Sequence, residues 1–401
     1  MALHTFDKRL LEFMYQLTLH QKLMTHKEMS QVITIQGEKV SERTIKRWLK
    51  WLKTHHYFTY YPHVIPERIG LVKCVVLITG LKDCKVLDII PYKTYSMLGT
   101  ELNTFERIFT THYNVPQNYL QDFESFWRKA QRHGLVDNYK ILKLQCSNAL
   151  YAPVHQLVNG DGRIDLSKSM STPLGLENLN HEMLDTDIHS EIKKNPFLIP
   201  FLIEYYKANT SSRKVWCSMK QKLAERIWDY IKDVKIKNKK SNGKGVHFAH
   251  RTLEYLHKNF NLFFRQIRVA YGPLYRDCNV SFCAVLNLKD KSDTEDLLKE
   301  MIKHSLFMTY NRPVNGKRLF LEVVTNTVGL NEIIGILSNW QSIKINEIVL
   351  FNYARSSEYW EDKTSGWLKQ HYHELFDPKT VSWRYDSEKY LQELQQLSTD
   401  S

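Results

Sequence analysis

Residues 66–80 read PERIGLVKCVVLITG, a turn that runs from a proline to a glycine and feeds a long apolar stretch. A longer segment of the chain begins with Arg43-Thr44-Ile45 and ends in this apolar stretch, at Val75–Ile78. A similar segment begins with Arg251-Thr252-Leu253 and ends in the apolar residues Cys283–Leu286. Starts and ends are both 208 positions apart (43 to 251 and 75 to 283). The sequence therefore indicates a duplicated unit of about half the chain; chance similarity of short segments is the alternative.

The elements around the apolar stretch repeat as well. In the first copy we expect a strand at 72–81, a helix at 85–90, strands at 95–98 and 105–112, a helix at 118–133 and a strand at 139–150. The second copy gives strands at 280–288, 306–310, 319–325 and 345–351 and helices at 293–304 and 330–340, with Asn315-Gly316 as a hairpin turn. This βαββαβ order predicts an antiparallel sheet with helices on one face, the ferredoxin-like arrangement.

Three helices precede the first sheet. One spans 6–20, and a second starts at Thr25, where Glu28 completes a capping box. Ser41 is a good N-cap for a third helix that ends near His55. The aromatic run 57–61, ended by Pro62, reads as a wing strand. Together these segments predict a winged helix-turn-helix domain.

The third helix has an apolar and a basic face. Ile45, Trp48, Leu49 and Leu52 follow the spacing of a core-facing stripe. The candidate DNA-binding residues on the other face are Arg43, Thr44, Lys46, Arg47, Lys50 and Lys53. Cations there would neutralise phosphates, and Arg43, Thr44 and Arg47 are the candidates for reading base edges. A solvated lysine-rich surface helix is the alternative.

A winged helix-turn-helix joined through Pro66-Glu67-Arg68-Ile69-Gly70 to a βαββαβ domain resembles the Lrp/AsnC family of transcription regulators. The resemblance covers roughly 6–151 and, more loosely, 196–353. It implies DNA binding by the helix-turn-helix and association of the α/β domains through their sheets. In many members the α/β domain also binds an amino acid. That effector region carries a Gly and an Asp after the third strand, and neither copy keeps both, so no effector residue is carried over.

The second copy has diverged in its helical part. Five lysines lie in one loop, at Lys235, Lys237, Lys239, Lys240 and Lys244. They precede a helix at 247–260 that carries His250 and Arg251 but also Glu254. Such a loop suits phosphate contacts, which are insensitive to sequence; a solvated loop is the alternative. We expect the second helix to read bases less well than the first.

The expected fold class is α+β, a tandem repeat of a winged helix-turn-helix and a ferredoxin-like domain. The expected domains are 1–64 (winged helix-turn-helix), 65–152 (ferredoxin-like), 153–195 (linker or wrapping segment), 196–272 (second winged helix-turn-helix), 273–353 (second ferredoxin-like) and 354–401 (C-terminal extension). In the extension, Trp360, Trp367 and Trp383 suggest docking on the body, and 390–397 reads as an amphipathic helix.

Composition limits the partners. The 401 residues carry a net charge of +13, which favours a polyanion, with double-stranded DNA first and an anionic membrane surface second. No apolar run approaches the roughly 20 residues of a membrane span, and we see no signal peptide at the first residues. The six cysteines show no metal-type spacing and suit a reducing compartment. We expect a cytoplasmic, nucleoid-associated protein that binds DNA, with self-association through the α/β domains possible and no membrane partner.

No catalytic constellation is evident. The chain lacks a phosphate-binding glycine loop and a nucleophile elbow. His371 and His373 have no third ligand that sequence identifies, and His112 and His133 have no identifiable partner. We therefore predict no metal, no cofactor and no enzymatic activity. A siroheme-decarboxylase-like enzyme on the same fold, and a scaffold that does not bind DNA, remain as alternatives; visible absorbance after purification would distinguish the first.

Overall fold

The protein is described here from a computed structural model. The structure describes residues 8–19, 24–54, 59–159, 163–167, 198–199, 251–252, 254–255, 264–270, 277–289, 293–313, 318–352, 375–377, 380 and 382–400.

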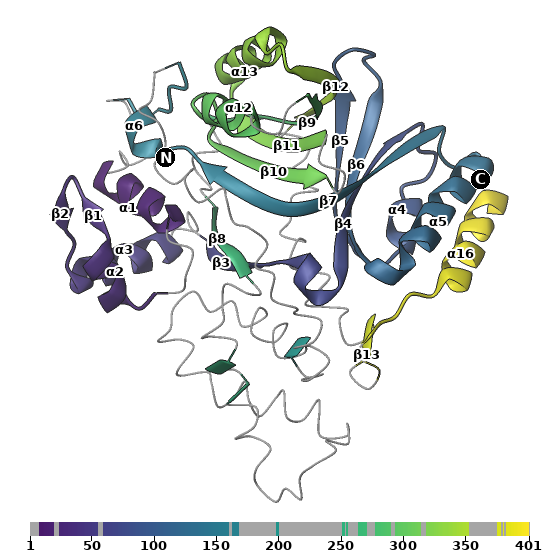
Figure 1. Cartoon of the computed structure of the whole chain (residues 1–401), viewed down its shortest axis with the longest axis horizontal. Helices are drawn as coiled ribbons and strands as arrows, with labels where there is room; N and C mark the ends of the chain where they lie inside the picture. The colour runs from purple at the N-terminus through teal and green to yellow at the C-terminus, as the bar shows by residue number, and fades with distance from the viewer. Residues whose placement is uncertain are drawn as a thin grey trace, which may run out of the picture.

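Eight antiparallel strands close into one barrel at the centre of the molecule (Figure 1). The first unit supplies β4 (Leu71–Thr79), β5 (Lys93–Glu101), β6 (Arg107–Pro116) and β7 (Asn138–Tyr151). The second supplies β9 (Val280–Leu288), β10 (Phe307–Pro313), β11 (Arg318–Thr325) and β12 (Ile343–Asn352). Their spatial orders, β5-β6-β4-β7 and β10-β11-β9-β12, are equivalent. The predicted α+β class and both βαββαβ orders are confirmed.

The two sheets join edge to edge within one chain. β7 pairs with β10 along most of its C-terminal half, and β12 pairs with β5 over three residues, from Val349↔Glu101 to Phe351↔Gly99. Joining all the edges leaves no sheet edge open in the barrel. Each copy therefore supplies half of one barrel, and the two copies pair with each other within a single chain.

The continuous apolar runs follow from this closure, because each sheet is buried on both faces. Val75 and Leu77 of β4 lie inside the barrel, in one apolar cluster with Cys283 and Val285 of β9. The alternate residues of β4 pack outward, in the core beneath the first unit's helices. Since successive side chains of a strand point to opposite faces, a strand covered on both sides needs apolar residues at nearly every position.

Helices cover the outer faces. The first unit has α4 (Val86–Ile89) and α5 (Leu120–Arg132), and the second has α12 (Asp293–Ile302) and α13 (Thr327–Asn339). The described part of the C-terminal segment has β13 (Phe376–Asp377), β14 (Ser382–Trp383) and α16 (Ser387–Asp400), which lies along α5 and α4 (Figure 1). The expected docking of Trp383 and the amphipathic helix are confirmed, whereas Trp360 and Trp367 lie outside the described residues.

The N-terminal helices are α1 (Lys8–Leu19), α2 (His26–Val32) and α3 (Glu42–Thr54). The predicted capping box of α2 is present, with Thr25 N donating to Glu28 and Glu28 N donating to the Thr25 hydroxyl. Ser41 caps α3 through the Thr44 amide at 3.2 Å. The connection between α2 and α3 differs from a simple turn, because β1 (Thr34–Ile35) and β2 (Glu38–Lys39) form a small hairpin there.

The predicted wing strand is corrected by the structure. The strand β3 spans Thr59–Val64, so Pro62 lies within it rather than ending it. β3 pairs with β8 (Phe264–Ala270) of the second unit, with Tyr61 opposite Arg268. Among the described strands β3 pairs with β8 alone, and a proline is tolerated in a strand that pairs on one side. The 3-10 helix η1 (Pro66–Ile69) and Gly70, at φ 78°, then lead into β4.

The start of the segment expected to link the two units packs on the body. It forms the short helix α6 (Val154–Leu157), which contacts α1, and a bridge between Val158 and Ile164. Leu157 and Leu166 are fully buried. These residues therefore pack around the core. The hairpin turn expected in the second unit, at Asn315-Gly316, lies outside the described residues. Within the described part of the chain, no helix is long and apolar enough to cross a membrane.

Candidate functional site

The third N-terminal helix presents the basic face that its sequence predicts. Ile45 and Leu52 are fully buried and Leu49 is 9% exposed, so one stripe of α3 is held in the core of the N-terminal domain. Trp48 packs at its margin, 5.2 Å from the Phe13 ring of α1. This anchoring fixes the rotation of the helix, and with it the direction of the opposite face.

The predicted DNA-binding residues of α3 are accessible. Arg43, Lys46, Arg47 and Lys50 are all exposed. Thr44 is half-buried, and its hydroxyl lies 3.0 Å from that of Ser41 at the helix start, so capping already uses it. Lys53 belongs to α3, but its side chain lies outside the described residues. Four cations therefore share one solvent-facing surface, which we call the α3 basic face.

The second unit's candidates are mostly outside the described residues. These are Lys235, Lys237, Lys239, Lys240, Lys244 and His250. Arg251 is exposed and helical, and the neighbouring Thr252 is buried. Helical geometry at Arg251 fits the helix expected at 247–260.

A second cluster of polar groups lies inside the barrel, and sequence reasoning did not find it. Its centre is Glu322 of β11, whose carboxylate accepts hydrogen bonds from the Tyr95 hydroxyl at 2.5 Å and the Thr309 hydroxyl at 2.8 Å. His112 Nε2 lies 3.2 Å from the same carboxylate, and Lys73 Nζ lies at 4.0 Å. Three of these residues come from the first unit and two from the second, so the cluster joins the two copies.

Burial sets the ionisation of the cluster. The pKa of His112 is lowered to about 3, because its fully buried ring has lost the hydration that a charged imidazolium needs. Burial alone would raise the pKa of Glu322, but His112, Lys73 and the two hydroxyl donors lower it to about 2. At neutral pH the cluster therefore holds an ionised carboxylate beside a neutral imidazole, which stacks on Tyr95 with ring centroids 4.0 Å apart.

One signal in the sequence could have pointed to this cluster. Glu322 is a lone carboxylate in an otherwise apolar run, residues 319–324, and such a residue needs a buried partner. The partner could not be named, because His112 lies 210 positions away. Among the described residues, no group of three or more His, Cys, Asp or Glu side chains is placed to hold a metal ion. His371 and His373 lie outside those residues.

Comparisons with known proteins give a likeness in structure only. No family model and no curated protein matches the chain. A solved structure of the siroheme decarboxylase NirDL is 12% identical, at a TM-score of 0.44, over 92% of this chain and 98% of that one. The same enzyme in co-complex with an iron-uroporphyrin III analogue is 11% identical, at a TM-score of 0.42 and the same coverage.

These findings correct the expectation that the chain has no enzymatic activity. Both of these solved structures are of an enzyme, so the expectation does not stand. It rested on missing motifs, and polar groups brought together from distant strands leave no local motif, as the buried cluster around Glu322 illustrates. At this identity and TM-score, the likeness assigns neither a substrate nor a reaction to this chain.

Proposed function

We propose that this chain is a DNA-binding transcription regulator of the Lrp/AsnC type that contacts duplex DNA through the α3 basic face. The observation that carries the proposal is the arrangement of α3. Three apolar side chains hold it in a three-helix core while Arg43, Lys46, Arg47 and Lys50 face solvent. A helix of this width fits the major groove of B-DNA, where cations meet phosphates and an arginine can reach a guanine edge.

The electrostatics favour the same partner. The net charge of +13 attracts a polyanion over a distance of about a Debye length, roughly 8–10 Å at physiological salt. The N-terminus of α3 adds the positive end of its helix dipole, and Arg43 is in its first turn. The helix dipole and Arg43 would favour a phosphate at the N-terminal end of α3.

The first experiment is a selection of bound duplexes from a random pool, followed by titration of the best duplex at several salt concentrations. We expect the triple variant R43A/K46A/R47A to bind at least about 10-fold more weakly. The slope of log K against log salt should fall by up to about 3, because each lost phosphate contact contributes about 0.9.

The matched control is R128A/K129A/R132A on α5, which removes three cations from an unrelated surface. It should change binding far less than the α3 variant. Equal losses in the two variants would mean that only net charge matters, and would contradict the α3 interface. A pool without enrichment would contradict DNA recognition itself.

The second unit is proposed to contact the DNA through its lysine-rich loop and Arg251. We expect these cations to add phosphate contacts without reading bases. Replacing Lys235, Lys237, Lys239, Lys240 and Lys244 by Gln should therefore lower affinity equally for specific and random duplexes, and flatten the salt dependence. Titration of both duplexes measures this, and a loss confined to the specific duplex would be inconsistent with phosphate contact alone.

A further inference from the structure

The helical face of the first α/β domain is covered by the C-terminal helix. α16 contacts both α4 and α5, and its Tyr390 and Leu394 are buried in the same core as Phe123 of α5. The segment before α16 is fixed by Trp383 Nε1, which donates to Ile69 O at 2.6 Å, and by Tyr385, which stacks on Tyr119 with ring centroids 5.1 Å apart. An amphipathic helix therefore completes this face.

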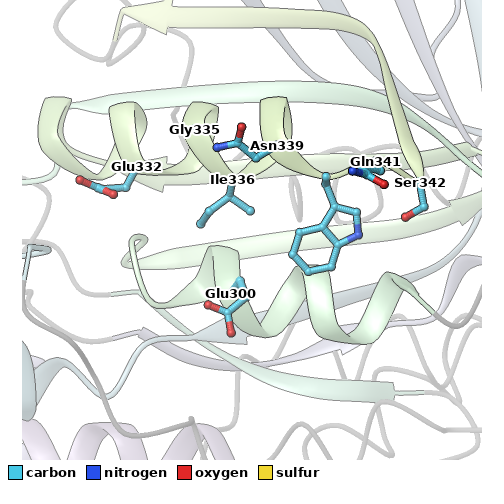
Figure 2. Close-up of a pocket in the computed structure, with 8 residues that line it drawn as sticks. Glu300, Glu332, Gly335, Ile336, Asn339, Gln341 and Ser342 are labelled. Carbon is cyan, nitrogen blue, oxygen red and sulfur yellow. The ribbon is translucent and has the colours of Figure 1, made fainter.

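The equivalent face of the second domain has a cavity instead. The order β9-α12-β10-β11-α13-β12 repeats β4-α4-β5-β6-α5-β7, so α12 and α13 correspond to α4 and α5. A cavity of about 660 Å³ lies along α12 and α13. We call it the α12/α13 groove, and its lining residues are Glu300, Glu332, Gly335, Ile336, Asn339, Trp340, Gln341 and Ser342. Figure 2 shows Ile336 pointing from α13 toward the helix that carries Glu300.

The lining has an apolar floor and an acidic edge. Ile336 and Trp340 are half-buried and pack on the core of the second domain, which leaves part of each side chain accessible. Glu300 is paired with Lys303 at 2.6 Å. Glu332 is exposed and forms no ion pair within the described part of the chain. Among the described residues, no lysine or arginine lines the groove, although the chain carries 13 more positive than negative charges.

We propose that the α12/α13 groove docks an amphipathic helix of a partner protein, whose apolar stripe covers Ile336 and Trp340 and whose Lys or Arg pairs with Glu332. The position of α16 on the first domain is the internal precedent, since the same pair of helices there accepts a helix of this kind. Apolar residues at i, i+3, i+4 and i+7 form the stripe that such a groove accepts. The acidic edge selects basic flanks over acidic ones.

The α16 helix of another copy does not meet this requirement. It carries Glu388, Glu393 and Asp400 against one cation, Lys389. Its own flanks would therefore repel Glu332, and its apolar side is already buried on α5. The charge of the groove thus favours a different protein over self-association.

The test uses the full chain and a displayed library of helical peptides, with apolar residues fixed at i, i+3, i+4 and i+7 and with random flanks. Peptides enriched on the wild type should carry Lys or Arg in their flanks. They should bind Ile336→Lys at least about 10-fold more weakly. Glu332→Lys should also weaken them, more than Glu332→Gln does, and the difference should shrink at high salt.

The matched control is Glu106→Lys, which makes the same charge change at an exposed position outside the groove and should leave binding unchanged. Glu332→Lys alters an exposed residue, so it keeps the test valid if Ile336→Lys unfolds. The proposal is overturned if no helical peptide is enriched or if enriched peptides bind both groove variants as tightly as the wild type. It is also overturned if acidic flanks are selected, or if the groove is closed by the chain itself so that no peptide enters.

Discussion

At the scale of single residues, the cluster inside the barrel surrounds one charged group, the Glu322 carboxylate, which is largely shielded from water. The side chain of Glu322 is 16% exposed, and it depends on Tyr95, Thr309 and Lys73 for the interactions that water would otherwise supply. The neutral His112 beside it fits the same logic, because a second buried cation would need its own anion. Since the donors come from both units, the carboxylate links their interior faces.

The cluster predicts a specific loss of stability in acid. The folded-state pKa values of His112 and Glu322, about 3 and about 2, lie below their ordinary values of 6.5 and 4.5. The unfolded chain therefore binds more protons, and acid favours unfolding. The stabilisation due to His112 is complete above pH 6.5 and disappears as the pH falls toward 3, and that due to Glu322 disappears between pH 4.5 and 2.

Denaturant titrations at about pH 6.5 and about pH 4.5 measure the contribution of His112. We expect the wild type to lose about 2 kcal/mol more than His112→Phe between these values, because Phe keeps the stacking on Tyr95 without a group to protonate. His133→Phe, at an exposed histidine beyond the end of α5, is the control and should behave like the wild type. Parallel losses in wild type and His112→Phe would contradict a neutral buried His112.

At the scale of elements, α16 shows how a terminal segment becomes part of the core. Its Tyr390, Leu391, Leu394 and Leu397 recur at helical spacing and pack against the first domain, and Ser387–Asp400 is helical as expected from that pattern. A helix of this length is marginal in isolation, so its stability comes from packing. Removing one apolar contact should therefore weaken the helix and the face beneath it together.

Leu394→Ala tests this coupling. Leu394 is 1% exposed, and its truncation should lower the free energy of unfolding by about 2–4 kcal/mol. Gln395→Ala changes an exposed neighbour on the same helix and should be close to neutral. Hydrogen exchange should show faster opening of both α16 and α5 in the leucine variant. Unchanged exchange in α5 would mean that α16 lies on the surface without supporting it.

At the scale of the whole molecule, barrel closure decides how the two copies relate. The β5–β12 seam is the shorter of the two and includes Gly99. A Cβ built there would lie 2.5 Å from the Val349 side chain and 2.6 Å from the Leu350 carbonyl oxygen, so the strands approach closely because residue 99 has no side chain. A substitution at this seam is therefore expected to disturb the packing of both units.

Gly99→Val should open that seam and lower the unfolding midpoint of the whole chain in one transition, with a loss of stability typical of overpacked cores, about 1–3 kcal/mol or more. Gly335→Ala is the control, since a Cβ added at Gly335 would meet no described atom within 4 Å and alanine favours the α13 helix. Circular dichroism melts compare the two. A Gly99→Val melt that matches the wild type would show that the seam does not hold the copies together.

Sequence alone determined the local elements. Apolar stripes, the Thr25 capping box and the Ser41 cap are short-range signals, and they located the helices of the N-terminal domain and the strands of both units to within a few residues. The repeat also follows from sequence, because equal spacing between similar segments survives without any contact information. The exposed face of α3 was predictable for the same reason, since helical periodicity fixes which side is buried.

Tertiary structure alone decided which strands and side chains of one copy contact those of the other. The pairing of β3 with β8, the two seams of the barrel and the partners of Glu322 in the first unit join residues that are far apart in the chain, and no local pattern encodes them. Local reasoning placed Pro62 at a strand end, because a proline is rare in a strand with neighbours on both sides. The fold places it within β3, which pairs with β8 alone among the described strands, and such a strand tolerates a proline. Local propensity sets the elements, and the burial of their remaining apolar faces sets their partners.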